Sequence, residues 1–80
     1  MGKKKTQHYQ SVHINYIQHS DQLFKLVVIE GVFSNGKVLA EFFLPRTAGQ
    51  SPVDIDSDVV RARLKRDFHI TFTHNSATYK

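Results

Sequence analysis

The densest group of residues able to do chemistry is a basic cluster in the last third of the chain. Guanidinium and ammonium groups at this density suit contacts with phosphates. The chain carries 11 Lys and Arg against 7 Asp and Glu, a net charge of +4 that also favours a polyanionic partner. The phosphate-binding residues that we predict are Arg61, Arg63, Lys65 and Arg66, assisted by Arg46 and by Lys3, Lys4 and Lys5.

The geometry of a helix would divide this cluster in two. Arg61 and Lys65 lie about one turn apart and share a side, while Arg63 and Arg66 point away from them. The same basic residues at the end of a helix also complement its dipole, so a solvated surface helix is the competing interpretation.

Two acidic residues, Glu30 and Glu41, are the candidates for acid–base chemistry. A β-hairpin that turns at Asn35-Gly36 places them directly opposite one another, and two close carboxylates can share a proton. They lie among apolar residues in mid-strand, and spacing links no His, Ser or Arg to them. We therefore predict no catalytic residues and expect that the protein is not an enzyme.

Five histidines and an acidic triplet raise the question of a metal site. His13 and His69 would be close if their strands paired, but no His-x-x-x-His spacing and no cysteine accompanies them. The Asp-x-Asp-x-Asp segment 54–58 resembles the opening of a calcium loop, yet it lacks the glycine and glutamate that such a loop needs. We predict neither a metal site nor a cofactor.

A β-hairpin from Lys25 to Pro45 is the clearest structural prediction. Asn35-Gly36 between two β-branched and aromatic runs is the strongest short hairpin signal, and both turn residues should have positive φ. This register places only apolar residues on one face, which we predict to be the core side. That face holds Val27, Ile29, Gly31 and Phe33 opposite Val38, Ala40, Phe42 and Leu44.

The second face of the predicted hairpin is too apolar to stay bare in water. We expect it to be covered in part or to contact a protein partner, including a second copy of the chain. An unpaired strand edge of the same sheet offers another route to such a contact. The apolar residues of the predicted interface are Leu26, Val28, Val32, Leu39 and Phe43.

Residues 57–67 are compatible with a helix or a strand. Alternating apolar residues favour a strand. A helix would begin at a capping Asp56 or Ser57, and its acidic start and basic end would match the helix dipole. We favour the helix because Arg-Ala-Arg-Leu-Lys-Arg is rich in strong helix formers.

The predicted fold class is α+β, an antiparallel meander of order β-β-β-α-β with one short helix packed on the sheet. The first and last strands are residues 11–17 and 68–73, where apolar and polar residues alternate. If the helix is instead a strand, a small all-β barrel results. Residues 1–8 are predicted to form a flexible basic arm, and residues 9–80 a single small domain.

Composition narrows the class of protein. There are no cysteines, and no apolar run approaches the roughly 20 residues of a membrane span. The basic start is not followed by the apolar segment of a secretory signal, so we expect a cytoplasmic protein. Gly2 and Thr6 match the short N-myristoylation pattern, which leaves lipidation open.

The leading hypothesis is a small non-enzymatic nucleic-acid-binding or regulatory protein that contacts phosphates through its basic segment. The alternative is a protein–protein interaction module or homodimer that uses the second face or an edge of the hairpin sheet. The sequence does not distinguish DNA from RNA.

Overall fold

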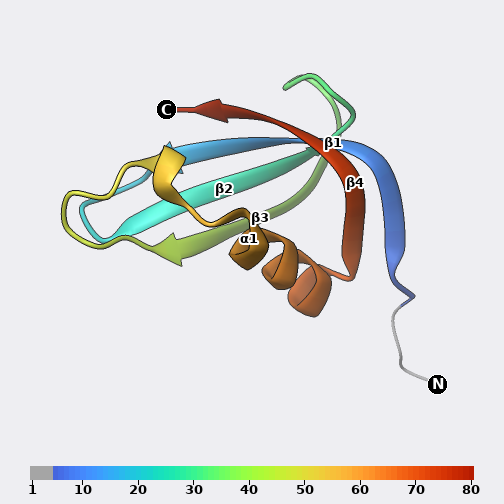
Figure 1. Ribbon diagram of the computed structural model, residues 1–80. Coiled ribbons are helices and arrows are strands. Elements are labelled where there is room, and N and C mark those ends of the chain that lie inside the picture. The colour runs from blue at the N-terminus through green and yellow to red at the C-terminus, as the bar shows by residue number, and fades with distance from the viewer. Residues whose placement is uncertain (1–4) are drawn as a thin grey trace.

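The computed structural model describes residues 5–80 and has an α+β fold, a four-stranded sheet crossed by one short helix (Figure 1). The predicted fold class is therefore confirmed, and residues 57–67 are helical. In chain order the elements are β1 (Gln7–Gln18), β2 (Leu23–Glu30), β3 (Val38–Pro45), the 3₁₀ turn η1 (Pro52–Asp54), α1 (Ser57–Arg63), the π-helical turn η2 (Leu64–Phe68) and β4 (Ile70–Tyr79).

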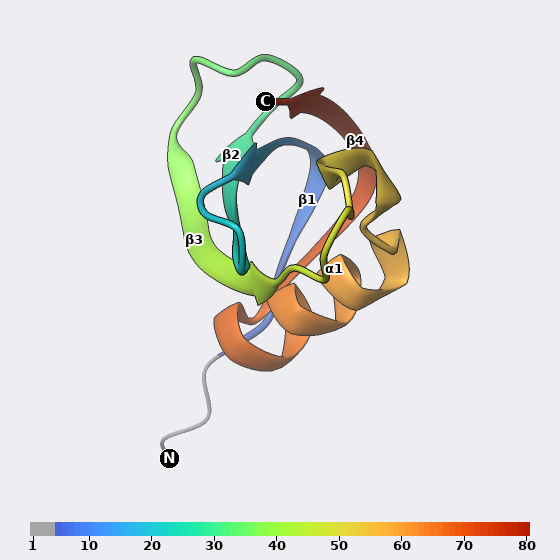
Figure 2. The same cartoon turned by 90° about the vertical axis from the view of Figure 1, so that its left-hand side faces the viewer.

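The strands lie in the order β3-β2-β1-β4. The first three form the predicted antiparallel meander, whereas β4 pairs with β1 in parallel, so the sheet is mixed. It remains open with β3 and β4 as its edges, and the barrel alternative is wrong. Because β3 and β4 run in the same direction on opposite edges, the chain between them must cross the sheet. Figure 2 shows the helix on that crossing.

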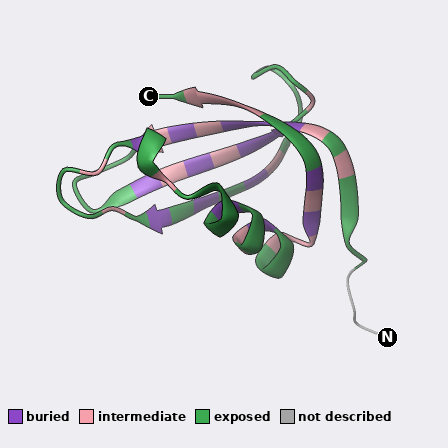
Figure 3. Ribbon diagram, in the orientation of Figure 1, coloured by how far each residue is buried: buried purple, intermediate pink, exposed green. Residues whose placement is uncertain are grey.

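The core lies between the helix and the face of the sheet that it covers. Buried residues alternate with more exposed ones along most of β2 and along β3, as expected for a sheet with one covered face (Figure 3). The helix contributes the fully buried side chains of Val60 and Leu64. The sheet contributes Val12, Ile14 and Tyr16 from β1, Phe24, Leu26 and Val28 from β2, Ala40, Phe42 and Leu44 from β3, and Ile70 and Phe72 from β4.

The hairpin of β2 and β3 forms and ends at Pro45 as predicted, but its predicted register is wrong. Leu26 pairs with Phe42, and Val28 pairs with Ala40. The core face of β2 therefore carries the even-numbered residues, and Val27 lies on the other face. The residues from Leu26 to Ile29 are all apolar, so alternation within β2 does not identify its buried side.

The predicted two-residue turn is also wrong. The connection spans residues 31–37, and the positive φ falls at Gly31 (98°) rather than at Asn35 or Gly36. Gly36 is needed for a different reason, because a Cβ atom there would lie 2.2 Å from the carbonyl oxygen of Glu30. A bulge at Leu39 then shifts the pairing by one residue, from Val28 with Ala40 to Ile29 with Val38.

This register separates the two predicted opposing carboxylates. Glu30 lies opposite Val12 on β1, and Glu41 lies opposite Val27 on β2. Glu41 instead forms a 3.2 Å ion pair with the ammonium group of Lys25. The candidate proton-sharing pair therefore does not form.

The ends of the chain differ from their predicted boundaries. β1 begins at Gln7, so residues 7 and 8 belong to the sheet and not to the predicted arm 1–8. Lys3 and Lys4 lie outside the described residues. The last strand begins at Ile70, because the helix continues as η2 to Phe68 and the next residue, His69, has a φ of 58°. No helix within residues 5–80 is long and apolar enough to cross a membrane.

The register predicts unequal costs for truncating neighbouring residues of β2. Leu26→Ala should lower the free energy of unfolding by about 2–5 kcal/mol, because it leaves a cavity in the core. Val27→Ala, on the partly exposed face, should cost about 1 kcal/mol. Urea denaturation followed by circular dichroism measures both. An equal or larger loss for Val27→Ala would contradict the register.

Candidate functional site

The basic cluster is held on a short helix with a defined start. The Asp56 side chain caps α1 by accepting a 2.8 Å hydrogen bond from the backbone N–H of Asp58. The helix then presents Arg61 and Lys65 to the β4 side and Arg63 and Arg66 to the β3 side. The predicted division of the cluster in two is confirmed.

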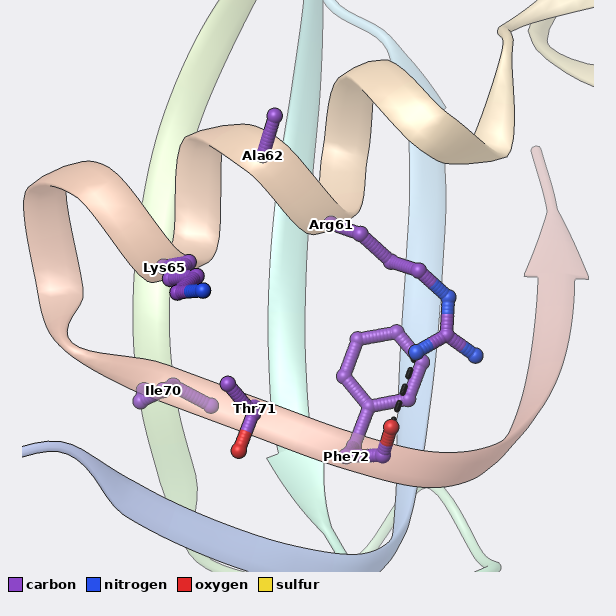
Figure 4. A pocket seen from close by; sticks show the side chains of 6 residues that line it. All are labelled: Arg61, Ala62, Lys65, Ile70, Thr71 and Phe72. Atoms are coloured by element: carbon purple, nitrogen blue, oxygen red, sulfur yellow. Dashed lines mark hydrogen bonds between the residues drawn. The ribbon is translucent and has the colours of Figure 1, made fainter.

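Arg61 caps the open edge of β4. Its Nη1 donates a 2.8 Å hydrogen bond to the carbonyl oxygen of Phe72, and its Nη2 lies 3.4 Å from the carbonyl oxygen of Thr73 (Figure 4). The guanidinium group also lies 4.1 Å from the centre of the Phe72 ring. These contacts fix the position of the guanidinium and satisfy carbonyl groups that an edge strand leaves unpaired.

Arg63 does the same at the opposite edge. Its Nη1 donates a 3.4 Å hydrogen bond to the carbonyl oxygen of Phe43 on β3, and its guanidinium lies 5.1 Å from the centre of the Phe42 ring. Its Nε also forms an ion pair with the carboxylate of Asp67. Through these contacts Arg63 helps to fix the helix on the sheet.

Arg66 shares the same carboxylate. Its Nε lies 2.9 Å from Oδ1 of Asp67. The hydrogen bond from Arg66 lowers the pKa of the Asp67 carboxyl, which favours its ionised form beside the two arginines. The positive charge on the β3 side of the helix is thus partly balanced.

Arg46 lies away from the cluster and joins two loops. Its Nε donates a 2.8 Å hydrogen bond to the carbonyl oxygen of Gln50, within the loop that follows β3. Its Nη1 donates a 3.0 Å hydrogen bond to the carbonyl oxygen of Asp21, in the turn between β1 and β2. We assign Arg46 a structural role and do not include it in the candidate site.

A groove of about 320 Å³ lies between the helix and β4. Figure 4 shows its side chains approaching from the two elements. We call it the basic groove because it contains two cations, and no acidic residue is among the described residues that line it. Its lining residues are Arg61, Ala62 and Lys65 from the helical segment and Ile70, Thr71 and Phe72 from the β4 strand.

The other hollows around the helix differ in charge. One of about 220 Å³ on the β3 side is lined in part by Arg63 and Arg66, whose charges Asp67 balances. Another of about 220 Å³ is lined in part by Asp54 and Asp56. Within residues 5–80, neither Arg61 nor Lys65 forms an ion pair.

The start of β1 lies beside the end of the basic cluster. The backbone N–H of Gln7 donates a 2.8 Å hydrogen bond to the carbonyl oxygen of His69, in the turn between η2 and β4. The exposed residue Lys5 is only two positions before Gln7. Lys5 therefore lies close in the chain to the backbone contact at the end of the helix that carries Lys65 and Arg66.

The histidines of β1 bind hydroxyl groups of β4, an arrangement that the sequence does not reveal. The two ring nitrogens of His8 lie 2.9 and 2.8 Å from the hydroxyl oxygens of Thr71 and Thr73. Those of His13 lie 2.7 and 2.9 Å from Ser76 and Thr78. Hydroxyl residues alternate along β4 in the sequence, but they indicate partners for the histidines only once the parallel pairing of β4 with β1 is known.

The structure offers no support for the proposed proximity of His13 and His69. His13 lies opposite Ser76, whereas the residue after His69 lies opposite Gln7. No group of three His, Cys, Asp or Glu residues suited to a metal ion occurs within residues 5–80.

The residues of the predicted protein interface do not share one exposed face. Leu26 and Val28 are fully buried in the core, because β2 turns the other side outward. Leu39 is partly buried and packs against the core. Val32, in the loop before β3, and Phe43, on β3, are 52% and 43% exposed.

Comparisons with known proteins do not assign a function to this site. No protein-family model, curated protein or solved structure matches the chain. The contacts and charges of the basic groove are therefore the guide to its function.

The edge contacts predict a specific effect of removing Arg63. Arg63→Ala should lower the free energy of unfolding by about 1–2 kcal/mol and promote self-association through the uncovered β3 edge. Arg66→Ala removes the same charge without touching a strand edge, and it is the matched control. Denaturation and size-exclusion chromatography with light scattering measure the two effects. Indistinguishable behaviour of the two variants would contradict the capping role.

Proposed function

We propose that the protein is a small non-enzymatic nucleic-acid-binding protein that contacts phosphates through the basic groove. The observation that carries this proposal is the presence of Arg61 and Lys65 in one groove whose lining contains no carboxylate among the described residues. Two such cations attract phosphate groups and release the counterions bound to them.

The hydrogen bonds of Arg61 do not cancel its charge. They use two of the five N–H donors of the guanidinium group, and both acceptors are neutral carbonyl oxygens. Donors therefore remain for a phosphate oxygen. Lys65 is exposed and supplies a second charge about one helical turn away.

The N-terminal lysines extend this proposed surface. Lys5 lies next to the segment that contacts His69, and Lys3 and Lys4 precede it in the sequence. Arg66 borders the same end of the helix with part of its charge balanced by Asp67. Relative to the predicted set, Arg46 and Arg63 have structural contacts and are not assigned phosphates.

Charge reversal at Lys65 tests the proposal. Lys65→Glu should weaken binding of a labelled oligonucleotide about tenfold or more at low salt and reduce the slope of log affinity against log salt by about one. Lys37→Glu makes the same charge change in the loop between β2 and β3, which lies away from α1 (Figure 1), and should have a small effect because Lys37 does not line the groove. Fluorescence anisotropy at several salt concentrations measures both.

Two results would overturn this function. One is an affinity of the unsubstituted protein that does not change with salt. The other is an equal loss of affinity in the Lys65 and Lys37 variants, because that would reflect net charge and not the groove.

A protein contact is the second candidate, favoured by the apolar loop between β2 and β3. Val32 and Phe33 in this loop are 52% and 72% exposed, and Val38, the first residue of β3, is 49% exposed. The loop is anchored on β4 by a 2.9 Å hydrogen bond from the Ser76 hydroxyl to the carbonyl oxygen of Val32. An anchored loop that exposes large apolar side chains suits a homodimer contact or another protein partner.

Substitution of Phe33 tests the homodimer form of this candidate. The unsubstituted protein should show a concentration-dependent increase in mass, and Phe33→Asp should abolish it with little loss of stability because the side chain is exposed. Val53→Asp changes another exposed apolar residue outside that loop and is the control. Light scattering measures the mass. A monomer at all concentrations of the unsubstituted protein would exclude the homodimer.

A further inference from the structure

We infer that the ligand of the basic groove is single-stranded nucleic acid, with one base stacked on the guanidinium group of Arg61 and a neighbouring phosphate bound by Lys65. This inference rests on the proposed function and specifies the form of the ligand. It follows from the way in which Arg61 is held and from the apolar residues that accompany the two cations.

Arg61 is held as a flat platform. The Phe72 ring lies 4.1 Å from the guanidinium carbon on one side, and the hydrogen bonds to Phe72 and Thr73 occupy part of its edge. The residue is nevertheless exposed and lines the groove, and we assign the base to the face of the guanidinium opposite Phe72. Nucleic-acid bases stack on arginine planes as they do on aromatic rings. A platform fixed in advance loses little side-chain freedom when a base binds.

The composition of the groove fits a base together with a phosphate. Ala62, Ile70 and Phe72 give it apolar surface, whereas Lys65 places a charge about one helical turn from Arg61 (Figure 4). A site for phosphate alone needs no apolar surface. A base covers such a surface while its own phosphate remains near the ammonium group.

A duplex does not present this combination. Its bases are stacked on one another inside the helix, and it offers mainly phosphates and sugars to a protein that approaches its backbone. Placing a base on Arg61 would require unstacking and unpairing of that base. A single strand has unpaired bases with free faces, so it can fill the groove without this loss.

Arg61→Lys tests the platform separately from the charge. The substitution keeps the positive charge but removes the planar group. It should weaken binding of a single strand of about ten nucleotides by fivefold or more, and it should leave the salt slope nearly unchanged because the charge is kept. Arg66→Lys makes the same exchange at an arginine that has no contact with an aromatic ring within residues 5–80, and it should have little effect.

Ala62→Leu provides a second test that leaves every charge in place. Ala62 is exposed and helical, and leucine is a strong helix former, so the larger side chain should narrow the groove without unfolding the domain. It should weaken single-strand binding severalfold and leave the salt slope unchanged. This variant keeps the inference testable if Arg61→Lys lowers stability.

Anisotropy titrations with a DNA strand, the corresponding RNA strand and the duplex of the same sequence give the decisive comparison at one salt concentration. We expect at least one single strand to bind about tenfold or more tightly than the duplex. Equal affinity for duplex and single strands would overturn the inference but leave the proposed function intact if binding still depends on salt and Lys65. Absence of salt-dependent binding to all three would overturn both.

Discussion

The crossing of the helix from one edge of the sheet to the other is the constraint on which the remaining structure depends. β3 and β4 are the two edges and run in the same direction, so α1 must cover the face between them. Residues two positions apart on a helix point about 200° apart. Arg61 and Arg63 therefore reach opposite edges, where each binds a carbonyl oxygen and a phenylalanine ring.

This arrangement gives the arginines unequal roles despite their similar positions in the sequence. Arg63 and Arg66 share the carboxylate of Asp67, so the positive charge on the β3 side of the helix is partly balanced by this ion-pair network. Arg61 has only neutral partners in its hydrogen bonds and keeps its charge beside Lys65. A single acidic residue at the end of the helix thus decides which side carries an unbalanced positive charge. The proposed binding site follows from this asymmetry.

The sequence patterns predict the elements better than they predict the partners of each residue. The α+β class, the capped helix and the division of the basic cluster follow from local charge order and helical period. The hairpin register does not, because Leu26 to Ile29 are apolar on both faces and the buried side is chosen by pairing with β1. The wall of the groove formed by Ile70, Thr71 and Phe72 is equally hidden, since only the parallel pairing of β4 brings these residues under the helix. The role of Arg61 depends on that tertiary contact.

The parallel pairing of β1 with β4 also has a consequence for how the chain folds. His8 and Thr71, which the pairing joins, are 63 positions apart in an 80-residue sequence. Contacts of such long range close a large loop before they gain any stabilisation, which slows folding. During synthesis, the hairpin strands emerge well before β4, so one edge of β1 stays unpaired until β4 has been made. The pairing of β4 with β1 therefore completes the sheet, the wall of the groove and the burial of β1 in a single late step.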